Sequence, residues 1–227
     1  MTPGNQRSIL FHSHQVQVYT MAKAEAVAAY LVYLAQVGEE GEPDPLTHLR
    51  LQKLLYYVQG WSVALRGQPM FADAIEAWVY GPVVVPVYHQ MKKFGARAFV
   101  IPDETNPPDF DATLTAADQE FIRGVWDEYK VYSALKLRDM THHEEPWQNA
   151  RKGYGPTERS SAPITPDTLK AYFGAERRTL AERRGRVGYP VIDPIAGWAA
   201  AEDAGRPGHR SEPAADVFTR LLAQCPE

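Results

Sequence analysis

The sequence predicts a mainly α-helical domain with a small β element. Apolar residues recur at the 3.6-residue period of a helix over most of residues 22–174, whereas strand-like alternation is confined to two short stretches, 74–80 and 98–101. The chain has 227 residues, 44% of them hydrophobic, and a formal net charge of −4. This composition supplies a sizeable core, so it excludes a wholly disordered chain, and it argues against a chain built to coat nucleic acid.

The helical segments are marked by apolar spacing and by their ends. In residues 22–37, Val27, Tyr30, Leu31 and Leu34 share one face. Thr47, Thr115 and Ser133 are suitable N-caps for the following helices. The predicted helices cover 22–37, 48–66, 82–94, 116–130, 134–142 and 166–173, with a short turn at 146–150.

The predicted strand at 74–80 alternates Ile75, Ala77 and Val79 with more polar or aromatic residues. The Gly81-Pro82 pair is expected to end this strand and to open a helix, because proline is tolerated in a first helical turn. Gly174 is expected to stop the helix that opens at Pro166.

The predicted organisation has three parts. Residues 1–20 form an N-terminal extension, either a disordered tail or residues added ahead of a natural start at Met21. Residues 21–174 form the folded domain, and residues 175–227 form a C-terminal extension, a basic helix followed by a partly disordered Gly-, Pro- and Ala-rich stretch. With one cysteine, no apolar run of membrane-spanning length and no signal-peptide pattern, we expect a cytoplasmic protein.

Catalytic motifs find little support in the sequence. The polar cluster Asp139, His142, His143, Glu144 and Glu145 suggests a metal-dependent hydrolase, but the spacing differs from that of the helical zinc motif. Histidines near a helix C-terminus serve equally well as helix-end groups. We therefore expect no catalytic residue, no metal and no cofactor.

Two features suggest binding surfaces. Lys53 and Tyr56 lie away from the apolar face that Leu51 and Leu54 define, so both are candidate contacts for a partner, although a solvated lysine and a core tyrosine are the simpler readings. Five arginines between residues 176 and 186 offer a nucleic-acid contact, or a solvated helix extension.

Three ordered blocks of the sequence contain a set of residues that we expect to be mainly structural: Leu51, Gln52, Lys53, Leu54, Tyr56, Tyr57, Trp61, Trp78, Gly81, Pro82, Tyr88, His142, Glu145, Pro146 and Trp147. Together these blocks resemble one known family, the Panacea domain of SocA-type and GepA-type phage-associated antitoxins. The resemblance covers roughly residues 22–174.

The resemblance implies an antitoxin of a bacterial or phage toxin–antitoxin system that neutralises its toxin by direct protein–protein binding. The toxin would be encoded by the adjacent gene. The alternative within this class is an adaptor that delivers the toxin to the ClpXP protease, and the alternatives outside it are a nucleic-acid-associated regulator and the metal-dependent hydrolase. No membrane partner is implied, and nucleic acid is a less favoured partner than protein.

The family pattern leaves partner choice open. A short amphipathic segment with Val217, Phe218 and Leu221 lies in the C-terminal extension, and such a segment can fold onto a groove of a partner. The candidate toxin-binding residues are therefore Lys53, Tyr56, Val217, Phe218 and Leu221.

Overall fold

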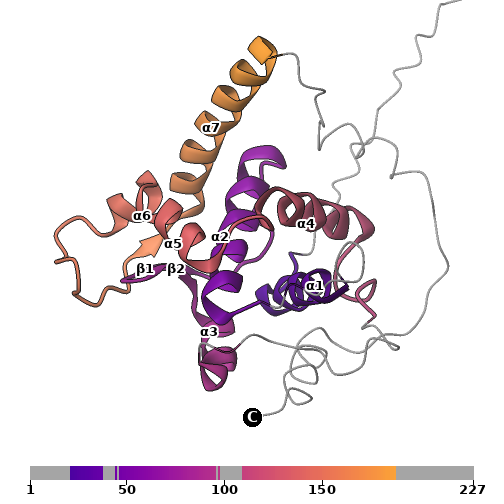
Figure 1. Cartoon of the computed structure of the whole chain (residues 1–227), viewed down its shortest axis with the longest axis horizontal. Coiled ribbons are helices and arrows are strands. Elements are labelled where there is room, and N and C mark those ends of the chain that lie inside the picture. The colour runs from indigo at the N-terminus through magenta and orange to yellow at the C-terminus, as the bar shows by residue number, and fades with distance from the viewer. Residues whose placement is uncertain (1–20, 38–43, 45, 96, 98–108, 188–227) are drawn as a thin grey trace, which may run out of the picture.

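A computed structural model describes residues 21–37, 44, 46–95, 97 and 109–187, with side chains up to Arg177. The predicted strand at 98–101, the segment around Val217 and the first 20 residues lie outside the described residues. The described part contains seven α-helices and a small sheet at one side of them, which confirms the predicted mainly α fold (Figure 1). No helix in these ranges is both long and apolar enough to cross a membrane.

The helices are α1 (Ala24–Val37), α2 (His48–Leu65), α3 (Val85–Met91), α4 (Ala116–Tyr129), α5 (Ala134–His142), α6 (Glu145–Ala150) and α7 (Pro166–Val187). A 3₁₀ turn, Lys92–Phe94, follows α3. The strands β1 (Ile75–Trp78), β2 (Gly81–Val84) and β3 (Pro163–Ile164) form one antiparallel sheet in the order β2-β1-β3.

Local capping signals set the helix starts where the sequence places them. The Thr47 side chain accepts a hydrogen bond from the backbone N–H of Arg50, and Ser133 does the same for Lys136. Thr115 and Asp118 form a reciprocal capping box at the start of α4. These predicted N-caps are confirmed, because a cap depends only on residues within one turn.

Helix α2 is the centre of the molecule. Every residue from Arg50 to Gly60 is buried, and the helix packs against α1, α3, α4, α5, α7 and β2. The sequence suggested an amphipathic helix with one solvent face, and this interpretation is wrong. Because neighbours cover α2 on every side, its polar side chains are enclosed and require hydrogen-bond partners within the protein.

The Gly81-Pro82 pair does not open a helix. Residues 81–84 form β2, which pairs with β1 from Ile75↔Val84 to Trp78↔Gly81, and α3 begins only at Val85. Pro82 is accommodated because β2 is an edge strand, where a missing N–H costs no ladder hydrogen bond. The turn between the strands consists of Val79 and Tyr80, and Gly81 takes a φ of +92° just after it.

Helix α7 does not stop at Gly174. It runs unbroken from Pro166 to Val187, and its second half extends beyond the other helices (Figure 1). Its first half is fixed by Leu169 and Phe173, both buried. The domain boundary near residue 175 stays a prediction and would fall within this helix.

Candidate functional site

The residues of the three motif blocks meet at one place, where α2 contacts the β1–β2 hairpin and the α5–α6 turn. Side chains of α2 take the place of a further strand along the outer edge of β2. The Gln52 Oε1 accepts a hydrogen bond from the Val84 N–H at 2.7 Å, and the Lys53 Nζ donates one to the Pro82 carbonyl at 2.7 Å. These contacts satisfy edge groups that would otherwise be buried without partners.

Lys53 is fully buried, so the expectation that it is exposed is wrong. Burial, together with the positive charge of Arg138, holds the pKa of the Lys53 amine well below its usual value. The side chain is enclosed because Gly81 lies directly against it. A Cβ at position 81 would lie 2.8 Å from both Lys53 Nζ and Thr141 Oγ1, so only glycine fits between them.

Tyr56 and Tyr57 share one acceptor. The Tyr56 hydroxyl donates to Glu144 Oε2 at 2.7 Å and the Tyr57 hydroxyl donates to Glu144 Oε1 at 2.8 Å. Burial raises the pKa of Glu144, and the two hydroxyl donors oppose that rise. Burial and the nearby carboxylate also raise the pKa of both tyrosines. The three side chains therefore form a buried polar cluster that connects α2 to the start of α6.

Tyr56 is fully buried in this cluster, which contradicts the reason for treating it as a surface contact. The same holds for Lys53. Neither side chain has exposed area in this fold, so a partner could reach them only by opening the core. The other three candidates, Val217, Phe218 and Leu221, lie outside the described residues.

The third block connects α6 to the hairpin. The Trp147 indole N–H donates to the Trp78 carbonyl at 2.9 Å, and the Arg151 guanidinium donates to the Ala77 carbonyl at 3.1 Å. His142 stacks on Trp147 with ring centroids 4.1 Å apart, and its Nε2 has no hydrogen-bond partner among the described residues. His142 therefore contacts α6 through its ring.

The remaining motif aromatics also hold elements together. The Trp61 indole N–H donates to the Tyr129 hydroxyl at 2.9 Å, which connects α2 to α4. Tyr88 lies against Trp78 with ring centroids 4.5 Å apart. Pro146 is buried in the first turn of α6, where its ring suits the helix start.

The geometry gives the metal hypothesis no support. The described residues contain no group of three His, Cys, Asp or Glu side chains placed to hold a metal ion. His143 Nδ1 contacts the Asp139 carbonyl at 2.7 Å, while the Asp139 carboxylate pairs with Arg138 at 2.6 Å. Each of these polar groups is engaged in a local helix-end contact.

Sequence reasoning missed two residues of this site. Glu144 was grouped with the histidines as a polar cluster, yet it is the shared acceptor of two tyrosines. Arg151 holds β1 and the 155–158 turn by donating to three carbonyls. The signal for Glu144 was the adjacent tyrosine pair on α2, because two buried hydroxyls require an acceptor.

The site is thus a buried hydrogen-bonded scaffold in a mainly helical domain. Residues 51–148 match the family model described as "Antitoxin SocA-like, Panacea domain". The resemblance predicted from the three motif blocks is confirmed over that range, which is narrower than the predicted 22–174.

The chain is also similar to Antitoxin SocA of Caulobacter vibrioides (strain NA1000 / CB15N). The two are 36% identical over 56 residues, which is 25% of this chain and 30% of that protein. The match therefore spans less than a third of the relative's length. No solved structure gives a significant match. The similarity suggests an antitoxin role for this chain.

Proposed function

We propose that this chain is an antitoxin that neutralises a cognate protein toxin by direct binding, in the cytoplasm, without catalysis. The observation that carries the proposal is the match of residues 51–148 to the antitoxin SocA-like Panacea domain. The burial of the motif supports a binding role rather than a catalytic one. Lys53, Tyr56 and Glu144 are enclosed and engaged in hydrogen bonds within the protein, which suits a scaffold that presents a surface.

The test is co-expression with the small protein encoded by the adjacent gene. That protein is induced alone and then together with the full chain, while growth and co-purification are measured. We expect the neighbour to arrest growth when it is alone, and we expect the full chain to restore growth and to co-elute with the neighbour at a fixed ratio. A neighbour that arrests growth equally with and without the full chain would contradict the proposal.

The half-life of the neighbour protein separates direct sequestration from the adaptor alternative. A sequestering antitoxin leaves the half-life unchanged or lengthens it, because the bound toxin is protected. An adaptor for ClpXP shortens it, and restores growth only in cells that contain the protease. Restored growth with a shortened half-life and no stable complex would replace direct neutralisation by the adaptor mechanism.

A matched pair of glycine variants tests whether the intact fold is needed to restore growth. Gly81→Ala places a methyl group against Lys53 and should abolish rescue by destabilising the domain. Gly67→Ala alters a glycine that also has a positive φ but whose Cβ meets no atom within 4 Å, so it should retain rescue. Equal rescue by both variants would contradict the scaffold role of the motif.

A further inference from the structure

One exposed surface combines aromatic rings with lysines. It consists of Trp78, Tyr80, Tyr88, Lys92 and Lys93, and is called the aromatic–basic face below. Tyr80 lies in the two-residue turn of the hairpin and is 67% exposed, although such turns usually hold small or polar residues. Trp78 and Tyr88 are half-buried, so each presents part of its ring to solvent.

The half-buried rings of Trp78 and Tyr88 are held in place by neighbouring side chains. The Trp78 indole N–H donates to the Glu76 carboxylate at 2.7 Å, and its ring meets Tyr88 at 63°. Tyr88 is supported in turn by the His48 ring, with centroids 4.9 Å apart. Aromatic side chains that are already fixed lose little conformational entropy on binding, which is why tyrosine and tryptophan are frequent interface anchors.

The charges beside these rings have one sign. Lys92 follows Tyr88 by one helical turn, and Lys93 and Arg97 are also exposed. No Asp or Glu occurs in the sequence between Glu76 and Asp103. Two acidic side chains hydrogen-bond to residues of this region and keep their negative charge: Glu76 accepts from Trp78, and Glu25 accepts from Gln90 at 3.3 Å. The exposed Lys92, Lys93 and Arg97 outnumber these two carboxylates, so the region carries a small net positive charge in a chain whose total is −4.

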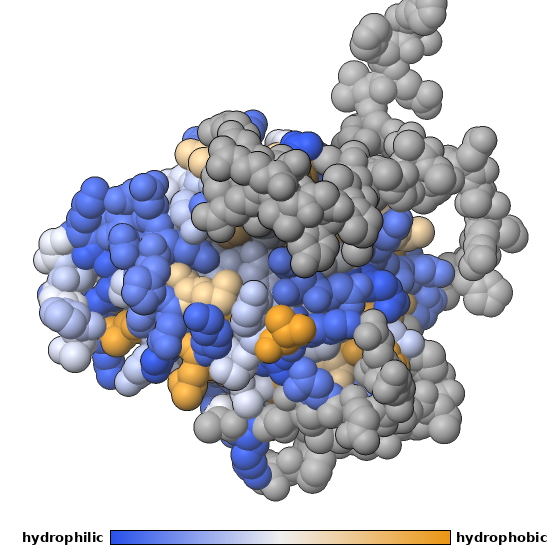
Figure 2. Space-filling model, turned by 45° about the horizontal axis from the view of Figure 1, so that its top comes forward, coloured by the Kyte–Doolittle hydropathy of each residue, from blue (hydrophilic) through white to orange (hydrophobic). Residues whose placement is uncertain are grey.

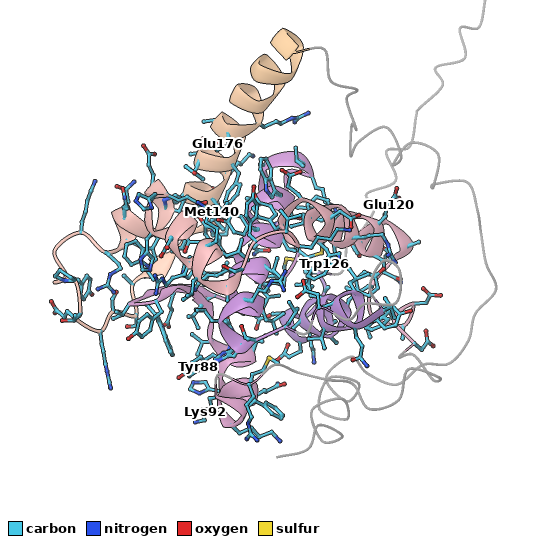
Figure 3. All side chains as sticks on the ribbon, in the orientation of Figure 1. Tyr88, Lys92, Glu120, Trp126, Met140 and Glu176 are labelled. Carbon is cyan, nitrogen blue, oxygen red and sulfur yellow. The ribbon has the colours of Figure 1, made fainter. Side chains whose placement is uncertain are left out.

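The face lies away from the C-terminal helix. Figure 3 shows Tyr88 and Lys92 together at the outer end of α3, on the opposite side of the body from Glu176 on α7. The surface seen in Figure 2 is mainly hydrophilic, with hydrophobic residues in small separate patches. An anchor made of tyrosine and tryptophan rings is compatible with such a surface, because these side chains combine an apolar body with a polar tip.

We propose that the aromatic–basic face is the docking surface for an acidic segment of the toxin, with apolar side chains of that segment packed on Trp78, Tyr80 and Tyr88. The inference rests on the proposed antitoxin function. Complementary charge favours the acidic occupant, since a basic partner would face Lys92 and Lys93. A second copy of the chain is disfavoured, because a two-fold contact would place this positively charged patch against itself.

Nucleic acid is the other anionic occupant, and the face suits it less well. Duplex affinity depends on many phosphate contacts, typically about six to ten, whereas this face offers two exposed lysines, with Arg97 exposed nearby in the sequence. An acidic protein segment uses both features of the face, because its charges pair at the rim while its apolar side chains bury the rings.

The experiment uses four forms of the full chain, the wild type and three variants, together with the purified protein from the adjacent gene. The test variants are Lys92→Glu with Lys93→Glu, and separately Tyr80→Ser. The matched control is Lys170→Glu with Arg177→Glu, two exposed residues of α7 that give the same change in charge. Far-UV circular dichroism and melting temperatures confirm that all the chains fold, and titration calorimetry at low and physiological salt gives each Kd.

We expect each test variant to weaken binding by about tenfold or more, and the control to stay within about threefold of the wild type. The double lysine variant should also lose most of the salt dependence, because its charges carry the electrostatic attraction. Charge reversal of acidic residues in the partner should restore binding to that variant alone.

The outcomes separate the two proposals. Wild-type affinity in both test variants overturns the docking face and leaves the antitoxin function standing, whereas no binding by the wild-type chain overturns both. Weakened binding in the control alone places the contact on α7 and refutes the face. If a 20-base-pair duplex binds the wild type but not the double lysine variant, the occupant of the face is nucleic acid and not the toxin. If the wild type is a dimer in sedimentation equilibrium and the double lysine variant is a monomer, the occupant is a second copy of the chain.

Discussion

The contact between α2 and α7 depends on a single glycine. A Cβ at position 60 would lie 2.1, 2.4 and 2.6 Å from three ring carbons of Phe173, all well inside the ordinary contact distance of 3.4–4 Å. The ring is buried and lies within reach of Tyr56, Tyr57 and Trp61, so it has no free direction in which to move. Gly60→Ala must therefore shift α7 away from α2.

The size of the effect follows from two opposing contributions. Overpacking of a filled core costs about 1–3 kcal/mol, and the severity of this overlap places the cost at the upper end or beyond. Replacing glycine by alanine inside a helix returns about 1 kcal/mol. We therefore expect Gly60→Ala to lower the free energy of unfolding by about 2 kcal/mol or more, which corresponds to a fall of several degrees in melting temperature.

A second glycine provides the control. Gly124 lies inside α4, and a Cβ there meets nothing within 4 Å. Gly124→Ala should therefore raise the free energy of unfolding by about 0.5–1 kcal/mol, because only the helix propensity changes. Urea unfolding followed by tryptophan fluorescence measures both variants.

The change in the free energy of unfolding should be opposite in sign for Gly60→Ala and Gly124→Ala, and this difference tests the packing of α7 on α2. If Gly60→Ala is as stable as the wild type, α7 does not pack on α2 in this way. In a Phe173→Ala background the same change should cost less than about 0.5 kcal/mol, because the ring that it meets is gone.

Three other predictions concern the motif residues. Tyr56→Phe removes a donor to the Glu144 carboxylate and should cost about 1.5–3 kcal/mol in urea unfolding, and an unchanged midpoint would contradict the cluster. Gly81→Ala should cost about 2–4 kcal/mol against about 1–2 kcal/mol for Gly67→Ala, because both have positive φ but only the first also meets Lys53; equal losses of melting temperature would disprove the close contact. Burial lowers the pKa of His48 to about 4, so between pH 6.5 and pH 4 the unfolded chain binds more protons than the folded one. As the pH falls through this range, the wild type should therefore lose about 1–2 kcal/mol of stability relative to His48→Phe. If urea unfolding shows a stability difference between the two proteins that does not change with pH, the prediction is refuted.

The sequence predicts best what is decided within one helical turn. The caps at Thr47, Thr115 and Ser133 lie where their residue types indicate, because each acts on a backbone N–H three residues away. The end of α7 is the counterexample. Glycine commonly ends a helix by taking a left-handed backbone conformation, but Gly174 does not take it. The helix therefore continues through Gly174 to Val187.

Exposure on α2 could not be predicted, because it is a tertiary property. The apolar positions of this helix mark one face, but other elements cover the remaining faces, so Lys53 and Tyr56 are buried with their own partners. The same limit applies to β2. Residues 81–84 become a strand, and not the start of a helix, because they pair with β1, donate a hydrogen bond to Gln52 and accept one from Lys53.

The burial of the motif determines which experiments can reveal the binding surface. Variants of Lys53, Tyr57 or Trp147 remove hydrogen bonds that connect α2, the hairpin and α6, so we expect them to destabilise the domain and to weaken the proposed partner binding indirectly. A loss of neutralisation in such variants therefore says nothing about the contact surface. Variants of exposed side chains such as Tyr80 leave the hydrogen-bonded scaffold intact, and a loss of affinity in them with an unchanged melting temperature locates the contact itself.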